Sequence, residues 1–181
     1  MNHKKTGYRG NIPYYLAAIA IFVLLKIGYA FADINDLAFL LKPTAKFVGL
    51  LTGSQAVYSP DHGYYYENLN IAIEKSCSGF NFWILGFLVF SYLGLKYFDK
   101  HLHKILTLPT ALIFAYLLTV FSNTSRIFAS VIVRNQTITI FPDKQYLIHE
   151  IVSIITNLSF LILAYCLIEF LLKRRYHAKF T

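Results

Sequence analysis

Three side chains at the ends of apolar segments carry the groups needed for acyl transfer: Cys77, Arg126 and His149. A thiolate attacks a carbonyl carbon, an imidazole carries the proton, and a guanidinium stabilises the oxyanion that forms. Cys77 precedes an apolar run, and the start of a helix together with Lys75 favours its thiolate form. Taken singly, Arg126 and His149 are each typical of a membrane interface. Their combination with Cys77 predicts one site.

The composition indicates an integral membrane protein. Hydrophobic residues make up 56% of the 181 residues, mean hydropathy is +0.50, and only 14% of residues are charged. An ordinary soluble domain carries roughly 25% charged residues, because polar surface must cover its core. The same numbers exclude a disordered chain. We therefore predict an all-α bundle in a lipid bilayer, folded as a single membrane domain over residues 1–181.

Apolar runs long enough to cross a bilayer, about 20 residues each, divide the chain. Four spans are predicted at about 12–31, 79–98, 105–122 and 149–172, with outer segments at 32–78 and 123–148. The first run also allows a cleaved signal peptide, since Ala30-Phe31-Ala32 resembles a cleavage site, but its length and Lys26 favour a retained span. The stretch from Leu37 to Leu51 is too short to span. It is predicted to form an interfacial or re-entrant helix pair hinged at Pro43.

Basic residues gather on one side of these spans. With the N-terminus inside, the inner side has ten basic and two acidic residues, and the outer side has six basic and seven acidic residues. This bias is typical of the positive-inside rule and predicts that both termini face the cytoplasm. The net charge of +8 follows from this topology, so nucleic-acid binding is not needed to explain it.

The two cysteines are predicted to lie toward opposite faces of the membrane. Cys77 is at the outer mouth of the second span, and Cys166 is near the inner end of the fourth. A disulfide between them is not expected, because it needs Cα atoms within about 7 Å of each other. Cys166 has the character of a small apolar residue in a helix. A thiol at Cys77 on the oxidising side marks that residue as a candidate nucleophile.

Other functions fit parts of the same pattern. A thiol–disulfide oxidoreductase needs paired cysteines, and only Cys77 is predicted at the outer face. A metal site built from His62, Cys77 and His149 has no recognisable ligand spacing, and no metal or cofactor is expected. The non-enzymatic alternative is a small membrane scaffold or assembly partner in which Cys77 and His149 only pack. Such a scaffold should tolerate Cys77→Ala.

In the order, spacing and topology of three motifs, the chain resembles the exosortase/archaeosortase family. The motifs are Cys77-Ser78-Gly79 at the start of a span, Asn123-Thr124-Ser125-Arg126 at the end of a later span, and His149 opening the last. The resemblance covers roughly residues 60–172. The chain is shorter than typical members and is similar to the compact exosortase K type. Many members have a glycine shortly after the histidine, where this chain has Ser153.

The resemblance implies a membrane-embedded cysteine protease and transpeptidase in the bacterial cytoplasmic membrane, acting at its outer face. Its partners would be membrane-anchored proteins with a C-terminal sorting signal (a short motif, a transmembrane helix and a basic tail) and an envelope acceptor. By the same resemblance Cys77 is the nucleophile, Arg126 the transition-state stabiliser and His149 the acid/base. Asn123 and Asn81 are implied as supporting residues. The segments 37–51 and 58–66 are expected to roof the site and exclude water.

Overall fold

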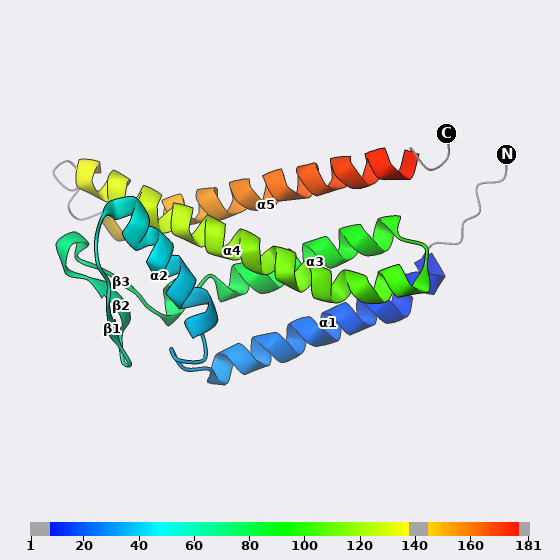
Figure 1. Ribbon diagram of the computed structural model, residues 1–181, viewed down its shortest axis with the longest axis horizontal. Coiled ribbons are helices and arrows are strands. Elements are labelled where there is room, and N and C mark those ends of the chain that lie inside the picture. The colour runs from blue at the N-terminus through cyan, green and yellow to red at the C-terminus, as the bar shows by residue number, and fades with distance from the viewer. Residues whose placement is uncertain (1–7, 138–144, 178–181) are drawn as a thin grey trace.

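The computed structural model describes residues 8–137 and 145–177 (Figure 1). The protein is mostly helical, at 80%. Its elements in chain order are α1 (Tyr8–Phe31), α2 (Ala38–Thr52), β1 (Val57–Ser59), β2 (Gly63–Tyr66), β3 (Ile71–Ile73), α3 (Phe80–Tyr97), α4 (His101–Thr137) and α5 (Gln145–His177). Short 3-10 turns cover Glu67–Leu69 and Lys75–Cys77, and the second turn carries the candidate nucleophile.

Within the described residues, four helices are long and apolar enough to cross a membrane. They are Gly10–Phe31, Lys75–Tyr97, His101–Arg134 and Glu150–Arg175. The third span was predicted to end at about residue 122, and α4 continues beyond that point as a helix to Thr137, so the first part of the predicted outer segment is helical. Its polar residues Asn123, Thr124 and Arg126 are buried, so the helix turns a polar face inward here. Residues 138–144 of the predicted outer segment lie outside the described part of the chain.

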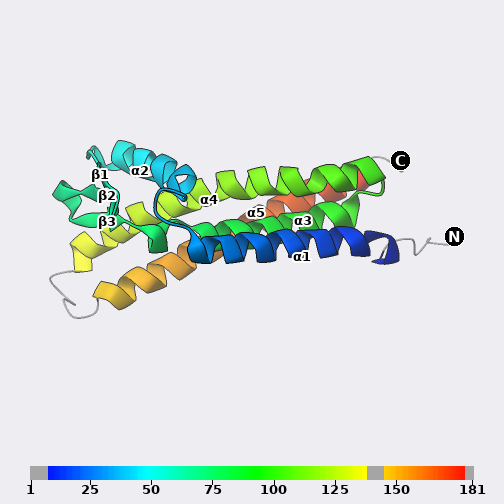
Figure 2. The ribbon, with the colours of Figure 1, turned by 90° about the horizontal axis from the view of Figure 1, so that it is seen from below.

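The long helices run side by side along the longest axis of the molecule (Figures 1 and 2). α1, α4 and α5 all pack against α3. α1 begins and α5 ends at one end of the bundle, where α3 also turns into α4 (Figure 1). α2 and the three strands lie at the opposite end, which we call the sheet end. This arrangement gathers the starts of α3 and α5 and the last part of α4 near the sheet.

Small residues allow α3 and α4 to approach closely. A Cβ atom added at Gly94 would lie 2.4 Å from Thr107 Cγ2, and one added at Gly86 would lie 3.4 Å from Ala115 Cβ. Helices in a bilayer pack through such contacts, since lipid is as apolar as the side chains. α1 and α5 differ, because much of their apolar surface stays exposed, as at Leu24 (69%). An exposed apolar face of this kind needs apolar surroundings.

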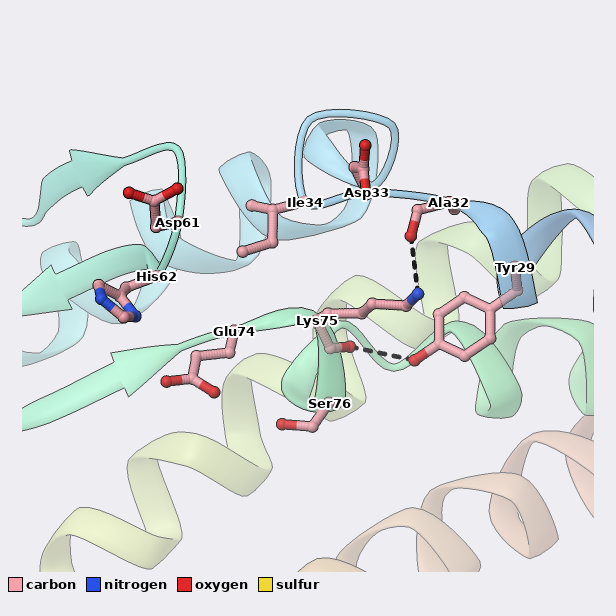
Figure 3. Close-up of a pocket in the computed structure, with 9 residues that line it drawn as sticks. All are labelled: Tyr29, Ala32, Asp33, Ile34, Asp61, His62, Glu74, Lys75 and Ser76. Atoms are coloured by element: carbon pink, nitrogen blue, oxygen red, sulfur yellow. Dashed lines mark hydrogen bonds between the residues drawn. The ribbon is translucent and has the colours of Figure 1, made fainter.

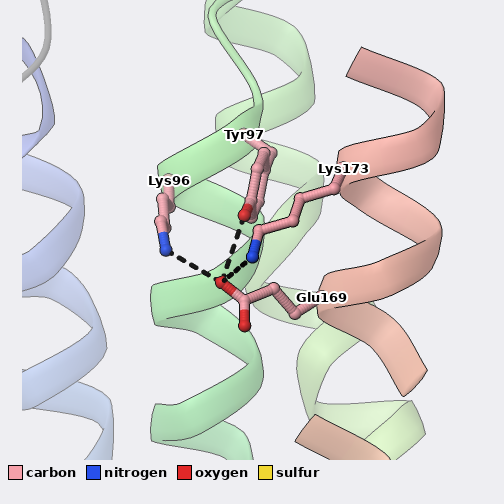
Figure 4. Close-up of polar contacts among 4 residues, drawn as sticks. All are labelled: Lys96, Tyr97, Glu169 and Lys173. Carbon is pink, nitrogen blue, oxygen red and sulfur yellow. Dashed lines mark hydrogen bonds and ion pairs between the residues drawn. The ribbon is translucent and has the colours of Figure 1, made fainter. Parts of the chain in front are cut away.

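A polar cluster joins α3 to α5 at the end away from the sheet (Figure 4). Glu169 of α5 forms ion pairs with Lys96 of α3 (3.0 Å) and with Lys173 of its own helix (3.5 Å). Tyr97 also donates a hydrogen bond to Glu169 (3.2 Å). We call these four residues the Glu169 cluster. In this cluster the three other side chains all meet the Glu169 carboxylate.

α2 is one continuous helix, so the prediction of a helix pair hinged at Pro43 is wrong. A proline inside a helix leaves the carbonyl oxygen four residues earlier without its usual N–H donor. Here that oxygen belongs to Phe39, and Tyr116 of α4 donates its hydroxyl to it (3.0 Å). A side chain from α4 therefore replaces the missing backbone bond and holds α2 against the bundle.

The sheet end carries a three-stranded antiparallel sheet in the order β1-β2-β3. The prediction of an all-α protein is therefore wrong for residues 57–73, although it is confirmed for the four long helices. Alternation along β2 buries Tyr66 completely and leaves Tyr65 exposed. The Tyr66 hydroxyl donates to the carbonyl oxygen of Ala45 in α2. Burial raises the pKa of Tyr66, which keeps this hydroxyl protonated and able to donate.

Candidate active site

Cys77 ends the 3-10 turn that leads from β3 into α3, and it is partly buried. The backbone N–H of Phe80 donates to Ser78 Oγ (3.3 Å) at the start of α3. Gly79 has a φ of 73°, in the left-handed region that favours glycine. A Cβ atom there would lie 3.0 Å from Thr119 Cγ2 and 3.3 Å from Asn123 Cγ. Ser78 and Gly79 thus set the entry into α3 and let the turn lie against α4.

Asn123 and Arg126 of α4 both bind the backbone of this turn. Asn123 Nδ2 donates to the carbonyl oxygen of Cys77 (2.7 Å), and Arg126 Nη2 donates to the same oxygen (3.4 Å). The two residues are three apart, so they share a face of the helix and reach one acceptor. Both are buried, with Asn123 2% and Arg126 9% exposed. The structure therefore brings Cys77, Asn123 and Arg126 together.

Arg126 also connects the turn to α5. Its Nη1 donates to Ser153 Oγ (3.4 Å), while its Nε has no hydrogen-bond partner among the described residues. His149 belongs to α5 one helical turn before Ser153, so positions 149 and 153 share a face of that helix. The side chain of His149 lies outside the described part of the chain. From the sequence alone, Ser153 was expected only to replace a glycine of the resembled family.

Asn81, implied as a supporting residue, is bound to α1. Lys26 Nζ donates to Asn81 Oδ1 (2.7 Å) and lies 5.8 Å from the ring centroid of Tyr29. An ionisable residue in an apolar helix requires such a partner. No role for Lys26 was predicted from the sequence. The sequence contains one indication of this contact: Lys26 and Asn81 interrupt two apolar runs near the same predicted face of the membrane.

α1 also holds the Cys77 turn through Lys75 (Figure 3). Tyr29 Oη donates to the carbonyl oxygen of Lys75 (3.2 Å), and Lys75 Nζ donates to the carbonyl oxygen of Ala32 (2.7 Å). Tyr29 stacks on Phe80, with 4.6 Å between ring centroids. The turn is thus held by α1 on one side and by α4 on the other. The effect of Lys75 on the Cys77 thiol stays a prediction.

Two cavities border the turn at the sheet end. The larger, about 530 Å³, is lined by the acidic side chains of Asp33, Asp61 and Glu74 together with His62 (Figure 3). The smaller, about 330 Å³, lies between β3, α4 and α5, and Cys77 lines it. His62 and Cys77 therefore line different cavities. Among the described residues no three His, Cys, Asp or Glu side chains gather as a metal site would require.

Comparison of the chain with protein-family models, with curated proteins and with solved structures finds no match. The arrangement around Cys77 is therefore interpreted from its own geometry and from the motifs in the sequence. That geometry has three parts: a thiol on a turn, two buried donors on one acceptor, and an apolar cavity beside the thiol.

Proposed function

We propose that the protein is a membrane-embedded cysteine protease and transpeptidase of the exosortase/archaeosortase kind. It cleaves the C-terminal sorting signals of exported, membrane-anchored proteins and transfers them to an envelope acceptor. The observation that carries this proposal is the pair of buried donors, Asn123 and Arg126, on the carbonyl oxygen of Cys77. Two segments that the resemblance couples are thereby in direct contact, although 46 and 49 residues separate them.

The exposed apolar surfaces of α1 and α5 support insertion in a bilayer. With four crossings, both termini face one side, and the positive-inside rule makes that side the cytoplasm. The sheet end then lies at the outer face, which in a bacterium is the outer face of the cytoplasmic membrane. Cys77 is at the height where an exported protein leaves the bilayer. α2 and the sheet cover the site from outside, which limits the access of water.

The burial of Arg126 makes its guanidinium suited to stabilising negative charge. A guanidinium has five N–H donors and stays charged, and in this structure one donor reaches Cys77, one reaches Ser153, and Nε remains available. A fixed cation in a site that excludes water stabilises developing negative charge strongly, because it needs no reorganisation during the reaction. Arg126 is therefore suited to an oxyanion forming beside Cys77.

The proposed reaction has two steps. The Cys77 thiolate attacks the scissile carbonyl carbon, a C–S bond forms, and the peptide C–N bond breaks as His149 gives its proton to the leaving amine. The released fragment carries the transmembrane helix and basic tail. A nucleophilic amine or hydroxyl of the acceptor then attacks the thioester and gives its proton to His149. This second step regenerates the thiolate and leaves the exported protein joined to its acceptor.

Co-expression with candidate substrates tests the proposal. The substrates are reporter proteins that end in a short motif, one transmembrane helix and a basic tail, and tail loss is followed by gel shift. Wild type is compared with Cys77→Ala, Arg126→Ala and His149→Ala, and each variant has a matched control: Cys166→Ala, Arg175→Ala and His62→Ala. We expect the first three to lose processing at unchanged protein levels and the controls to keep it. Processing that survives Cys77→Ala contradicts the proposal. A chain whose function in the membrane does not depend on Cys77 would instead be a scaffold.

A further inference from the structure

The cavity beside Cys77 is apolar on three sides. β3 contributes Ile71 and Ala72, α4 contributes Ile127 and Val131, and α5 contributes Ile148 and Val152. Its volume of about 330 Å³ is at the lower end of the range of roughly 300–1,000 Å³ for small-molecule sites. A cavity of this size accepts one apolar side chain rather than a folded partner.

Two polar side chains of α4, Arg134 and Ser130, also line the cavity. Arg134 Nη1 donates to the carbonyl oxygen of Asn70 (3.0 Å), which ties the end of α4 to the loop before β3. The Ser130 hydroxyl oxygen is buried and has no hydrogen-bond partner among the described residues. One hydroxyl is thus available for a backbone group of an occupant, while the surrounding surface favours an apolar side chain.

We propose that this cavity is the specificity pocket of the enzyme and takes an apolar side chain of the substrate residue that supplies the scissile carbonyl. The inference rests on the proposed function, because an acyl group on Cys77 Sγ must extend into space that Cys77 lines. The other cavity at this turn has charged side chains of both signs in its lining, and Cys77 is not among its lining residues. Occupancy of the apolar cavity places the acyl carbonyl beside Cys77 and near Arg126.

Ala72 sets the size of this pocket. It is the smallest residue of the three walls, it is partly buried, and its backbone pairs with Tyr65 across the sheet. Ala72→Leu keeps the strand pairing and adds apolar volume to the cavity. Val57→Leu, on the exposed face of β1 and outside the cavity, is the matched control. Val131→Leu adds apolar volume to the cavity from α4, and it replaces Ala72→Leu in the test if that variant does not fold.

Thiol reagents of different size test the pocket without any substrate. The full-length chain with Cys166→Ala, in detergent or in vesicles, is treated with methyl, benzyl or sulfonatoethyl methanethiosulfonate. The Cys77 thiolate attacks the sulfenyl sulfur of the reagent, which forms a disulfide between Cys77 and the organic group. The S–S bond of the reagent breaks, and methanesulfinate leaves. Intact-mass spectrometry gives the rate of each modification.

We expect the benzyl reagent to modify Cys77, and its rate relative to that of the methyl reagent measures how well the cavity accepts an apolar group. The anionic sulfonatoethyl reagent reports the influence of Arg134, which also lines the cavity. Ala72→Leu should lower the rate of the benzyl reagent about tenfold, because apolar pockets discriminate by size, and should leave the rate of the methyl reagent unchanged. The Val57→Leu control should react with both reagents at the wild-type rates. Equal slowing of the methyl and benzyl reagents, or slowing of neither, overturns the pocket. Processing that survives Cys77→Ala overturns the proposed function instead, and it leaves the reagent rates as a separate result.

Discussion

The Cys77 turn and the Glu169 cluster are both polar regions that join helices, but they are built differently. At the turn, the buried side chains of Asn123 and Arg126 donate to one backbone carbonyl oxygen. In the Glu169 cluster, the exposed side chains of Lys96 (40%) and Lys173 (56%) meet a single carboxylate (Figure 4). The acceptor at the turn is a backbone oxygen, whereas the acceptor in the cluster is a side-chain carboxylate.

This difference separates a region that positions a group from one that only connects two helices. Accessible ion pairs contribute little, because solvent screens the charges and ordering long side chains costs entropy. Removal of a buried donor costs more, because the buried acceptor loses its hydrogen bond. Changes at the Cys77 turn should therefore affect both processing and stability, and changes at the Glu169 cluster should affect neither strongly.

Arg126→Ala is expected to have the largest effect. Processing should fall by about 10²–10³-fold, the usual result of removing one donor to a developing oxyanion. The rate of tail loss from a reporter substrate measures this effect, with Arg175→Ala as the control for loss of an accessible arginine. Arg126→Lys keeps the charge without the forked donors and should recover only part of the rate. Full processing by Arg126→Ala would contradict a direct role for the guanidinium.

Gly79→Ala tests how closely the turn must approach α4. The left-handed backbone alone costs about 1–2 kcal/mol for a residue with a Cβ atom. Gly53 provides the control, because its φ is 65° and nothing lies within 4 Å of an added Cβ. Chemical unfolding in detergent should show a larger loss for Gly79→Ala than for Gly53→Ala, because only the former meets Thr119 and Asn123. Equal losses would show that contact with α4 is not required.

Asn123→Ala separates stability from positioning. Asn157 is a matched residue, since its Oδ1 accepts a hydrogen bond from Ser122 (2.9 Å) between α4 and α5. Each alanine substitution should lower the free energy of unfolding by about 1 kcal/mol. Only Asn123→Ala should also slow processing, because only Asn123 holds the Cys77 carbonyl. If Asn157→Ala slows processing as much, the effect comes from general loosening of the bundle.

Glu169→Gln is expected to have the smallest effect. The substitution removes the charge that pairs with Lys96 and Lys173 but keeps a hydrogen-bond acceptor of similar shape. The melting temperature in detergent and the rate of processing should stay close to those of wild type. A loss as large as that of Asn123→Ala would show that this cluster also positions the site.

The bundle was predictable from sequence because span length and apolar composition are local properties. The sheet was not, since β1 and β3 have three residues each and strand pairing depends on distant partners. The length of α4 was not predictable, because Asn123 and Arg126 open a polar segment in which the sequence does not show whether the helix continues. In the folded protein they are buried donors, and their partner lies on another element.

The proximity of Cys77, Asn123 and Arg126 was also predictable from sequence, since their segments were predicted at the outer ends of spans. Their supporting contacts were not. Lys26 with Asn81, Tyr116 with the carbonyl oxygen freed by Pro43, and Arg126 with Ser153 each join separate helices. Such pairs depend on helix rotation and height, which the apolar pattern of one helix does not fix.

The most direct test of the central claim is the mass of the Cys77 peptide after reaction with a processed reporter substrate. The mixture is quenched in acid, digested and compared with and without neutral hydroxylamine, which cleaves thioesters. We predict that the new C-terminal residue of the substrate is joined to Cys77 and that hydroxylamine releases it, while the Cys166 peptide is unmodified. Substrate cleavage without any adduct at Cys77, together with cleavage by Cys77→Ala, would contradict the account.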